Sequence, residues 1–145
     1  MLLYRQRDGK LEVLLVHPGG PFWQKRDEGV WSIPKGEFAE DEVGIDVARR
    51  EFQEELGTAA PPGEATPLGE VRQKGGKVVY AWSLIGDLDV TRTTSNTFEI
   101  EWPPRSGKVQ TFPEVDRAAW FDAATARRKL VPAQSAFIDR LEEQL

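Results

Sequence analysis

The sequence contains no cysteine, one histidine (His17) and one methionine in 145 residues. Disulfide bonds and thiolate metal sites are therefore excluded, and one histidine is too few for a histidine-built zinc site. No apolar run is long enough to span a bilayer, and no signal peptide is visible. Basic residues are fewer than acidic ones: 19 Lys and Arg stand against 24 Asp and Glu, which gives a net charge of −5.

These absences narrow the class of protein. The negative charge argues against general nucleic-acid binding and against a membrane surface, but it permits one bound nucleotide, which needs only a few local cations. We expect a cytoplasmic protein with a small-molecule partner, either a monomer or a homodimer. The length fits one domain, residues 1–145, with a real hydrophobic core. The chain opens directly on a predicted strand, so we expect the native start to lie a few residues upstream.

The first two strands are predicted from a turn signal between two apolar runs. Leu2–Gln6 and Leu11–His17 flank an Asp8-Gly9 pair, which is typical of a tight hairpin. The second run is apolar on both faces, which indicates a central, buried strand. Further strands are predicted at Val30–Ile33, Glu70–Lys74, Lys77–Ile85, Asn96–Trp102 and Ala118–Phe121, and two helices at Ala123–Arg128 and Pro132–Gln144. Strands on both sides of a central helix, with a helix at the end, favour a mixed sheet between helices.

The central helix is predicted over Ile45–Leu56, with an apolar stripe at helical spacing and Gly57 as a left-handed stop. The stripe consists of Ile45, Ala48, Phe52 and Leu56. Three glutamates, Glu51, Glu54 and Glu55, are spaced i, i+3 and i+4, so they share the other side of the helix. Carboxylates crowded in this way repel one another unless a cation lies between them, and Mg²⁺ takes oxygen ligands of this kind. The alternative is a solvated acidic face, but such a face would require no particular residues upstream.

Particular residues do stand upstream. Gly36 is followed after five residues by Glu42, and after seven more by the run Arg50-Glu51-Phe52-Gln53-Glu54-Glu55-Leu56-Gly57. This arrangement resembles the signature sequence of the Nudix hydrolases, and only Thr58 departs, because an aliphatic residue is usual there. The resemblance implies an α/β/α sandwich with a mixed sheet between helices. It also implies a Mg²⁺- or Mn²⁺-dependent pyrophosphohydrolase that cleaves a nucleoside diphosphate linked to another group.

The resemblance assigns roles to individual residues. It implies metal ligands at Glu51, Glu54, Glu55 and the carbonyl of Gly36. Arg50 would orient the catalytic glutamate, Glu51, and Glu42 would support the site. In Phe112–Asp116, which precedes Trp120, Glu114 resembles the loop glutamate that acts in related hydrolases as a further metal ligand or as a general base. An exposed loop acid is the alternative for Glu114.

Substrate binding is predicted at two positions. Lys35 adjoins Gly36 and suits a phosphate oxygen, and the run Trp31–Gly36 resembles Nudix members acting on dinucleoside polyphosphates, capped RNA ends and diphosphoinositol phosphates. Trp23, in a polar loop, is the best candidate to stack a base. Core packing is expected for Trp31, Tyr80 and Trp102, and a packed or hydrogen-bonded role for His17. Other loop residues that could meet an anion or a base are Phe22, Lys25, Arg26, Arg105 and Lys108.

The sequence therefore predicts a nucleotide pyrophosphohydrolase, with a nucleoside triphosphate or a dinucleoside polyphosphate as substrate. A nucleotide-pool cleaner that acts on oxidised triphosphates remains open. The rival from another class is a catalytically silent Nudix-fold module that binds or senses a nucleotide. That rival is disfavoured, because all the glutamates of the signature are present.

Overall fold

The computed structural model describes residues 1–35 and 44–145. The predictions for Gly36 and Glu42 fall outside these residues. In chain order the elements are β1 (Leu2–Arg7), β2 (Lys10–Pro18), α1 (Gly44–Leu56), β3 (Thr66–Arg72), β4 (Val78–Ile85), the 3₁₀ turn η1 (Val90–Arg92), β5 (Thr97–Glu101), β6 (Val109–Pro113), β7 (Val115–Asp122), α2 (Ala123–Lys129), the 3₁₀ turn η2 (Pro132–Gln134) and α3 (Ser135–Gln144). No helix in this described part is both long and apolar enough to cross a bilayer.

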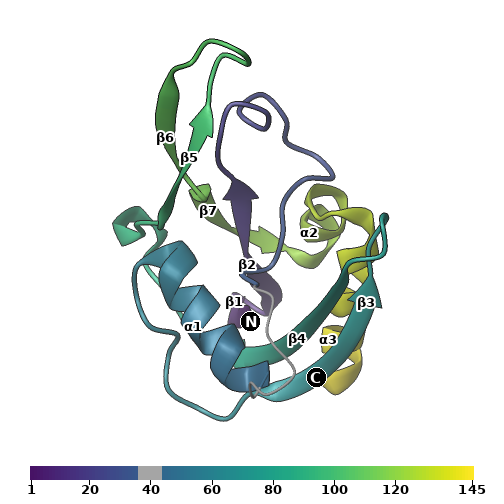
Figure 1. The fold of residues 1–145 in the computed structure, drawn as a ribbon. Coiled ribbons are helices and arrows are strands. Elements are labelled where there is room, and N and C mark those ends of the chain that lie inside the picture. The colour runs from purple at the N-terminus through teal and green to yellow at the C-terminus, as the bar shows by residue number, and fades with distance from the viewer. Residues whose placement is uncertain (36–43) are drawn as a thin grey trace.

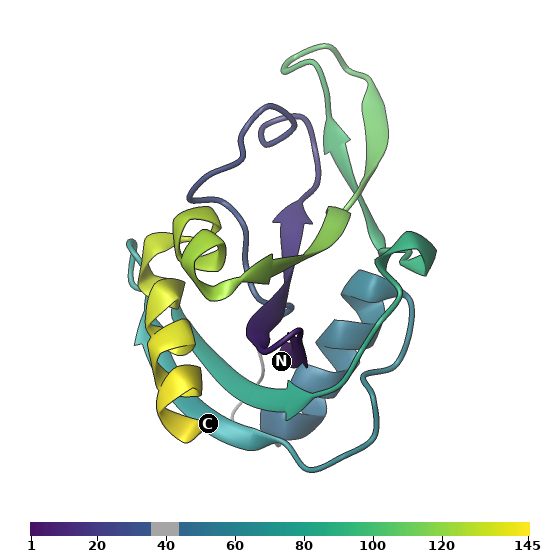
Figure 2. The ribbon, with the colours of Figure 1, turned by 180° about the vertical axis from the view of Figure 1, so that it is seen from behind.

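Five strands form one mixed sheet in the order β3-β4-β1-β2-β7, in which β1 and β4 are parallel and the other neighbours are antiparallel. β5 and β6 form a separate hairpin that extends from the body of the molecule (Figures 1 and 2). The β1–β2 hairpin turns at Asp8 and Gly9, which have φ values of 55° and 77°. These values suit a primed turn, whose twist matches that of the flanking strands. The predicted fold class, a mixed sheet between helices, is confirmed.

The central strand β2 separates two hydrophobic clusters, because successive side chains of a strand point to opposite faces. Val13 and Leu15 belong to the cluster that includes residues of α2 and α3. Leu14 and Val16 belong to the cluster that includes residues of α1. The helices thus cover both faces of the sheet, as Figures 1 and 2 show. The predicted stripe of α1 is confirmed, since Ala48, Phe52 and Leu56 are buried and Ile45 packs against the same cluster.

One predicted strand is wrong, and one strand was missed. Val30–Ile33 is not a strand but makes only isolated bridges, Trp31 to Leu130 and Ser32 to Val16. The side chain of Trp31 instead packs in the core. Pro34 comes directly after Ile33, at the end of the predicted strand. β6 was not predicted, because its side chains are exposed except for half-buried Phe112, and no alternation of apolar residues marks it. Its pairing with β5 creates it.

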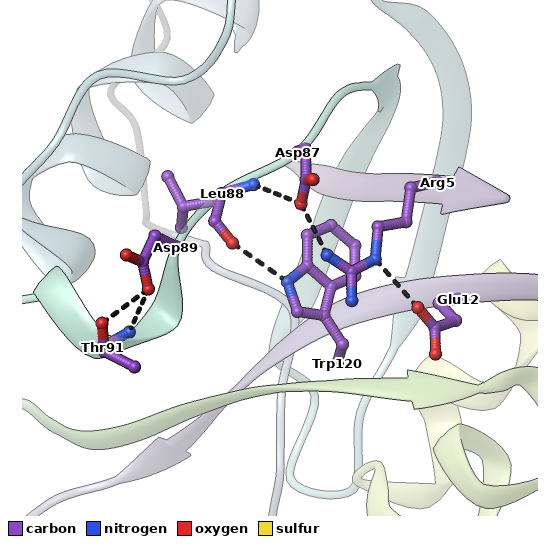
Figure 3. A network of polar contacts seen from close by, with 7 residues as sticks. All are labelled: Arg5, Glu12, Asp87, Leu88, Asp89, Thr91 and Trp120. Atoms are coloured by element: carbon purple, nitrogen blue, oxygen red, sulfur yellow. Dashed lines mark hydrogen bonds and ion pairs between the residues drawn. The ribbon is translucent and has the colours of Figure 1, made fainter. Parts of the chain in front are cut away.

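A polar network fixes the segment that follows β4 (Figure 3). Arg5 donates to Glu12 at 2.8 Å and to Asp87 at 2.5 Å, and its guanidinium lies 3.9 Å from the ring centroid of Trp120. Trp120 donates through Nε1 to the carbonyl of Leu88 at 3.2 Å. The network ties β1, β2 and β7 to the start of a segment that reaches the carboxyl end of α1 at residues 94–96.

Residues 94–96 complete the end of α1. The backbone N–H of Thr94 donates to the carbonyl of Leu56 at 3.0 Å, and that of Asn96 donates to the carbonyl of Glu54 at 2.9 Å. A helix leaves its last carbonyls without partners inside the helix, so this segment satisfies them. Gly57 has a φ of +74°, as predicted for a left-handed stop, and a Cβ there would lie 2.4 Å from the backbone oxygen of Thr94.

We expect Gly57→Ala to lower the free energy of unfolding by about 2–4 kcal/mol, because it combines a left-handed backbone with a backbone clash. Gly9→Ala is the matched control, since Gly9 has a φ of +77° and nothing within 4 Å of a Cβ. The control should cost only about 1–2 kcal/mol. Urea unfolding of both variants measures the difference, and equal losses would show that the Thr94 contact does not constrain α1.

Candidate active site

The glutamates of α1 form one acidic face, as predicted. The side chains of Glu51 and Glu54 lie next to each other. Arg50 lies beside both, with Nη2 3.7 Å from Glu51 Oε1 and Nε 3.9 Å from Glu54 Oε1. Burial is the main cause that raises the pKa of Glu51, the charge of Glu54 adds to it, and Arg50 opposes it. This arrangement is compatible with the orienting role predicted for Arg50.

Glu55 faces the segment that ends at Lys35. The backbone of Lys35 donates a hydrogen bond to the Glu55 carboxylate, and the charged side chain of Lys35 is close enough to stabilise its ionised form. Burial dominates, however, and raises the pKa of Glu55 to about 7. Glu55 Oε2 is buried and has no hydrogen-bond partner among residues 1–35 and 44–145. An unpaired buried carboxylate oxygen is costly unless a cation or a proton occupies the place in front of it.

Glu114 stands between β6 and β7 and is joined to α1 through a single residue. Asn96, which donates its N–H to Glu54, accepts through its own carbonyl from the N–H of Glu114 at 2.8 Å. The carbonyl of Glu114 accepts from the N–H of Gly19 at 2.9 Å. A Cβ at Gly19 would lie 1.9 Å from the carbonyl oxygen of Pro113. Only glycine permits this approach, and it brings the Glu114 loop to the end of β2.

One cavity of ≈ 510 Å³ brings four of the predicted residues together: Trp23, Lys35, Glu55 and Glu114. Its remaining lining residues are Val16, Pro18, Gly29, Val30, Ser32, Gln73, Lys74, Val115, Val131 and Pro132. Arg50 and Glu54 line a separate hollow of ≈ 430 Å³ with Gln53, Gly57 and Asn96. Glu51 lies near residues of both hollows, because the charges of Glu54 and Glu114 both raise its pKa. The acidic face of α1 therefore meets the cavity at Glu55.

Another hollow, of ≈ 520 Å³, lies beside Arg5, Arg7, Asp87 and Trp120. Its charged groups already serve the fold, since Arg5 pairs with Asp87 and Glu12 and stacks on Trp120 (Figure 3). The cavity at Glu55 instead holds a buried carboxylate oxygen without a partner. The cavity at Glu55 is therefore the candidate active site.

The loop after β2 is anchored by His17, which is fully buried. Its Nδ1 lies 2.7 Å from Asp116 Oδ1, and its Nε2 lies 2.6 Å from the carbonyl oxygen of Arg26. Trp31 packs edge-on against His17 and donates to Asp27 at 2.8 Å. The predictions of a hydrogen-bonded His17 and a buried Trp31 are confirmed. The anchored loop places Trp23 at the cavity with 37% of its surface exposed.

Other sequence candidates lie elsewhere. Tyr80 was expected in the core, but it is 44% exposed, because it stands on a face of β4 where it hydrogen-bonds to Glu70. Trp102 is half-buried and contacts Phe22 edge-on with ring centroids 5.1 Å apart. Arg105 and Lys108 belong to the loop between β5 and β6, outside the lining of the cavity. Of the loop cations proposed as anion contacts, Arg26 stacks over Trp23 at 5.5 Å.

Sequence reasoning missed the contribution of the β3–β4 turn. Gln73 and Lys74 line the cavity, although they stand 18 and 19 residues after Glu55 in the sequence. The Gly75-Gly76 pair marked the turn, but nothing local shows which element a turn approaches. Pairing of β4 with β1 brings the turn to this site.

The donor set fits a hard divalent cation. Glu51, Glu54, Glu55 and Glu114 offer carboxylate oxygens of the type that Mg²⁺ and Mn²⁺ prefer, and Glu55 Oε2 is buried without a partner. Within residues 1–35 and 44–145, no three acidic or histidine side chains converge tightly enough to form a metal site as they stand.

Comparison with known proteins identifies the family of the chain. The family model described as NUDIX domain matches residues 1–141. The chain therefore belongs to the NUDIX domain family, and pyrophosphohydrolase is the class of enzyme that this membership indicates. The family generally uses divalent metal cations. No curated protein matches the chain.

Solved structures share the fold at low sequence identity. The Ap4A hydrolase of C. elegans, solved as a binary complex, is 20% identical with a TM-score of 0.64, over 99% of this chain and 93% of that chain. The NUDIX domain of Shewanella oneidensis NrtR, complexed with ADP ribose, is 19% identical with a TM-score of 0.63, over 99% and 83%. A MutT protein from Methanosarcina mazei Go1 is 20% identical with a TM-score of 0.56, over 99% and 92%.

We expect Glu55→Gln to stabilise the metal-free protein at pH 8 by on the order of 1–3 kcal/mol. The folded-state pKa of Glu55 is raised to about 7, so ionisation of Glu55 opposes folding above that pH. The gain should shrink as the pH falls and vanish below about 4.5, where Glu55 is protonated in both states. Urea unfolding from pH 4 to 8 measures it. Glu64→Gln, at an exposed loop position, is the control and should change little, whereas an equal gain in the control would contradict the burial argument.

Proposed function

We propose that the protein is a Mg²⁺-dependent pyrophosphohydrolase that cleaves a nucleoside triphosphate or a dinucleoside polyphosphate. The observation that carries the proposal is the cavity in which Lys35, Glu55 and Glu114 meet beside Trp23. A cation, two carboxylates and an aromatic ring are the groups needed to hold a phosphate chain, its metal ions and a base. Ap4A, in the name of the C. elegans hydrolase, and ADP ribose, in the complex of NrtR, are both nucleotide compounds and agree with this class of substrate.

Glu51, Glu54, Glu55 and Glu114 would hold the divalent cations, together with the carbonyl of Gly36 that the family resemblance implies. When bound, such ions polarise a phosphoryl oxygen and lower the pKa of bound water. In the proposed reaction, water attacks a phosphorus atom of the diphosphate, and the bond from that phosphorus to the bridging oxygen breaks. The bridging oxygen leaves with the other product.

The residues of the chain provide proton transfer and positioning. We assign the general base to Glu51, because burial raises its pKa toward the working pH, which favours acceptance of a proton from water. Arg50 orients this carboxylate from the solvent side, where it lies within 4 Å of both Glu51 and Glu54. Lys35 neutralises charge on the phosphate chain as a point charge. Glu114, between β6 and β7, completes the set of metal ligands.

The rival function is a binding module that holds a nucleotide without cleaving it. One experiment separates the two: the protein is incubated with Mg²⁺ and a panel of nucleoside triphosphates and dinucleoside polyphosphates, and the products are resolved by anion-exchange chromatography. Release of a nucleoside monophosphate or diphosphate that requires Mg²⁺ supports the hydrolase. Nucleotide binding without turnover at any Mg²⁺ or Mn²⁺ concentration would support the binding module instead.

We expect Lys35→Ala and Glu114→Gln to affect different kinetic constants. Lys35 contacts the phosphate chain in both the ground state and the transition state, so its loss should raise KM by roughly tenfold with a small change in kcat. Glu114→Gln should lower kcat by ~10–10²-fold, and higher Mg²⁺ should restore part of the rate, because one anionic ligand is lost.

Steady-state kinetics across a Mg²⁺ titration measure both effects. Lys10→Ala and Glu143→Gln, at exposed positions outside the cavity lining, are the matched controls. A Glu114→Gln variant with unchanged kcat and unchanged metal dependence would remove Glu114 from the site.

A further inference from the structure

Gln73 presents a polar side chain to the cavity from the base of the β3–β4 turn. Its backbone is engaged within the turn, since its N–H donates to the carbonyl of Lys77 at 2.7 Å and its carbonyl accepts from Gly76 at 2.9 Å. The side chain is half-buried and lines the same cavity as Trp23, Lys35 and Glu55. The orientation of its amide therefore decides whether this wall of the cavity donates or accepts hydrogen bonds.

Gln134 determines that orientation. Gln134 is fully buried, and its Oε1 accepts from the backbone N–H of Ile33 at 3.0 Å. A backbone N–H can only donate, so the oxygen of the Gln134 amide must face Ile33 and the nitrogen must face away. Gln134 Nε2 then donates to Gln73 Oε1 at 2.8 Å and to Ser32 Oγ at 3.1 Å.

The orientation of the Gln134 amide determines the orientation of the Gln73 amide. Because Gln73 Oε1 faces Gln134 as its acceptor, the Nε2 group, with two N–H donors, lies on the other side of the amide. A free glutamine can pair with adenine, by accepting from the 6-amino group and donating to N7. Gln73 Oε1 keeps a second lone pair, but the oxygen is directed at Gln134, which is not among the described lining residues of the cavity. In this orientation the amide offers the cavity its N–H donors rather than its acceptor.

We propose that Gln73, positioned by Gln134, is a specificity residue that selects nucleotides whose base carries hydrogen-bond acceptors, 6-oxopurines, over 6-aminopurines. The inference rests on the proposed function, because it assigns the base of the nucleotide to the cavity. The O6 and N7 atoms of a 6-oxopurine are adjacent acceptors, so an N–H group of Gln73 can donate to either of them. The 6-amino group of adenine would instead place a donor against a donor.

The test compares inosine triphosphate with adenosine triphosphate, two purine nucleotides that differ only at position 6 and its ring neighbour. Dissociation constants are measured by calorimetry with Ca²⁺, and kcat/KM is measured with Mg²⁺. We expect a preference of about tenfold or more for inosine triphosphate, because one unpaired polar contact in a recognition site is strongly disfavoured. 7-Deaza-guanosine triphosphate, which lacks the N7 acceptor, should bind less well than guanosine triphosphate.

Three variants separate recognition from structure. Gln73→Met removes the donors and should bring the ratio of inosine to adenosine triphosphate close to one. Gln134→Met keeps the volume but releases the Gln73 amide, so it should also reduce the ratio, through better use of adenosine triphosphate. Gln144→Met is the matched control, since Gln144 joins α3 to Ser83 and Pro67 and lies outside the cavity lining. Its ratio should equal that of the unaltered protein.

The outcomes distinguish this inference from the proposed function. Binding that follows the predicted ratio without hydrolysis would overturn the pyrophosphohydrolase but support the role of Gln73. Hydrolysis with equal use of inosine and adenosine triphosphate, unchanged in Gln73→Met, would overturn the role of Gln73 alone. No measurable binding of any of these nucleotides would overturn the role of Gln73 as well as the proposed function.

Discussion

A short run of backbone hydrogen bonds holds the candidate active site together. Asn96 donates to the carbonyl of Glu54 at the end of α1 and accepts from the N–H of Glu114, and the carbonyl of Glu114 accepts from Gly19 at the end of β2. Four segments far apart in the sequence, at residues 19, 54, 96 and 114, thus meet through main-chain groups. Backbone bonds of this kind do not depend on side-chain rotamers, so they position carboxylates on different elements more firmly than surface ion pairs would. The acidic side chains can then repel one another without separating the elements that carry them.

The site holds buried carboxylates whose ionised forms are unfavourable, and a bound cation can stabilise them. Glu55 is buried, its Oε2 lacks a partner, and burial raises its pKa to about 7. The pKa of Glu51 is raised for the same main reason, with Glu54 and Glu114 adding like charge. Arg50 and Lys35 offset part of this cost. Groups whose pKa values are displaced by burial and by like charge inside a cavity are typical of functional sites.

Most of the fold follows from local patterns that the tertiary structure reinforces. The hairpin at Asp8-Gly9, the buried central strand β2, the apolar stripe of α1 and the stop at Gly57 all agree with their sequence signals. The failures occur where local signal is weak or is overridden. β6 has no apolar alternation and exists because β5 pairs with it. Tyr80 has a residue type that suits a core, but its register with Glu70 places it outside.

The sequence by itself determined the family and the acidic face of α1. The spacing of Glu51, Glu54 and Glu55 is enough to predict the acidic face, because side chains at this spacing lie on the same side of a helix. Only the tertiary structure decided that Lys35, Glu55, Glu114 and Trp23 share one cavity, and that Gln73 and Lys74 join them. It also decided the polarity of Gln73, which depends on the buried contact between Gln134 and Ile33, about 100 residues apart. Long-range contacts of this kind follow from sheet pairing and packing, and no local pattern encodes them.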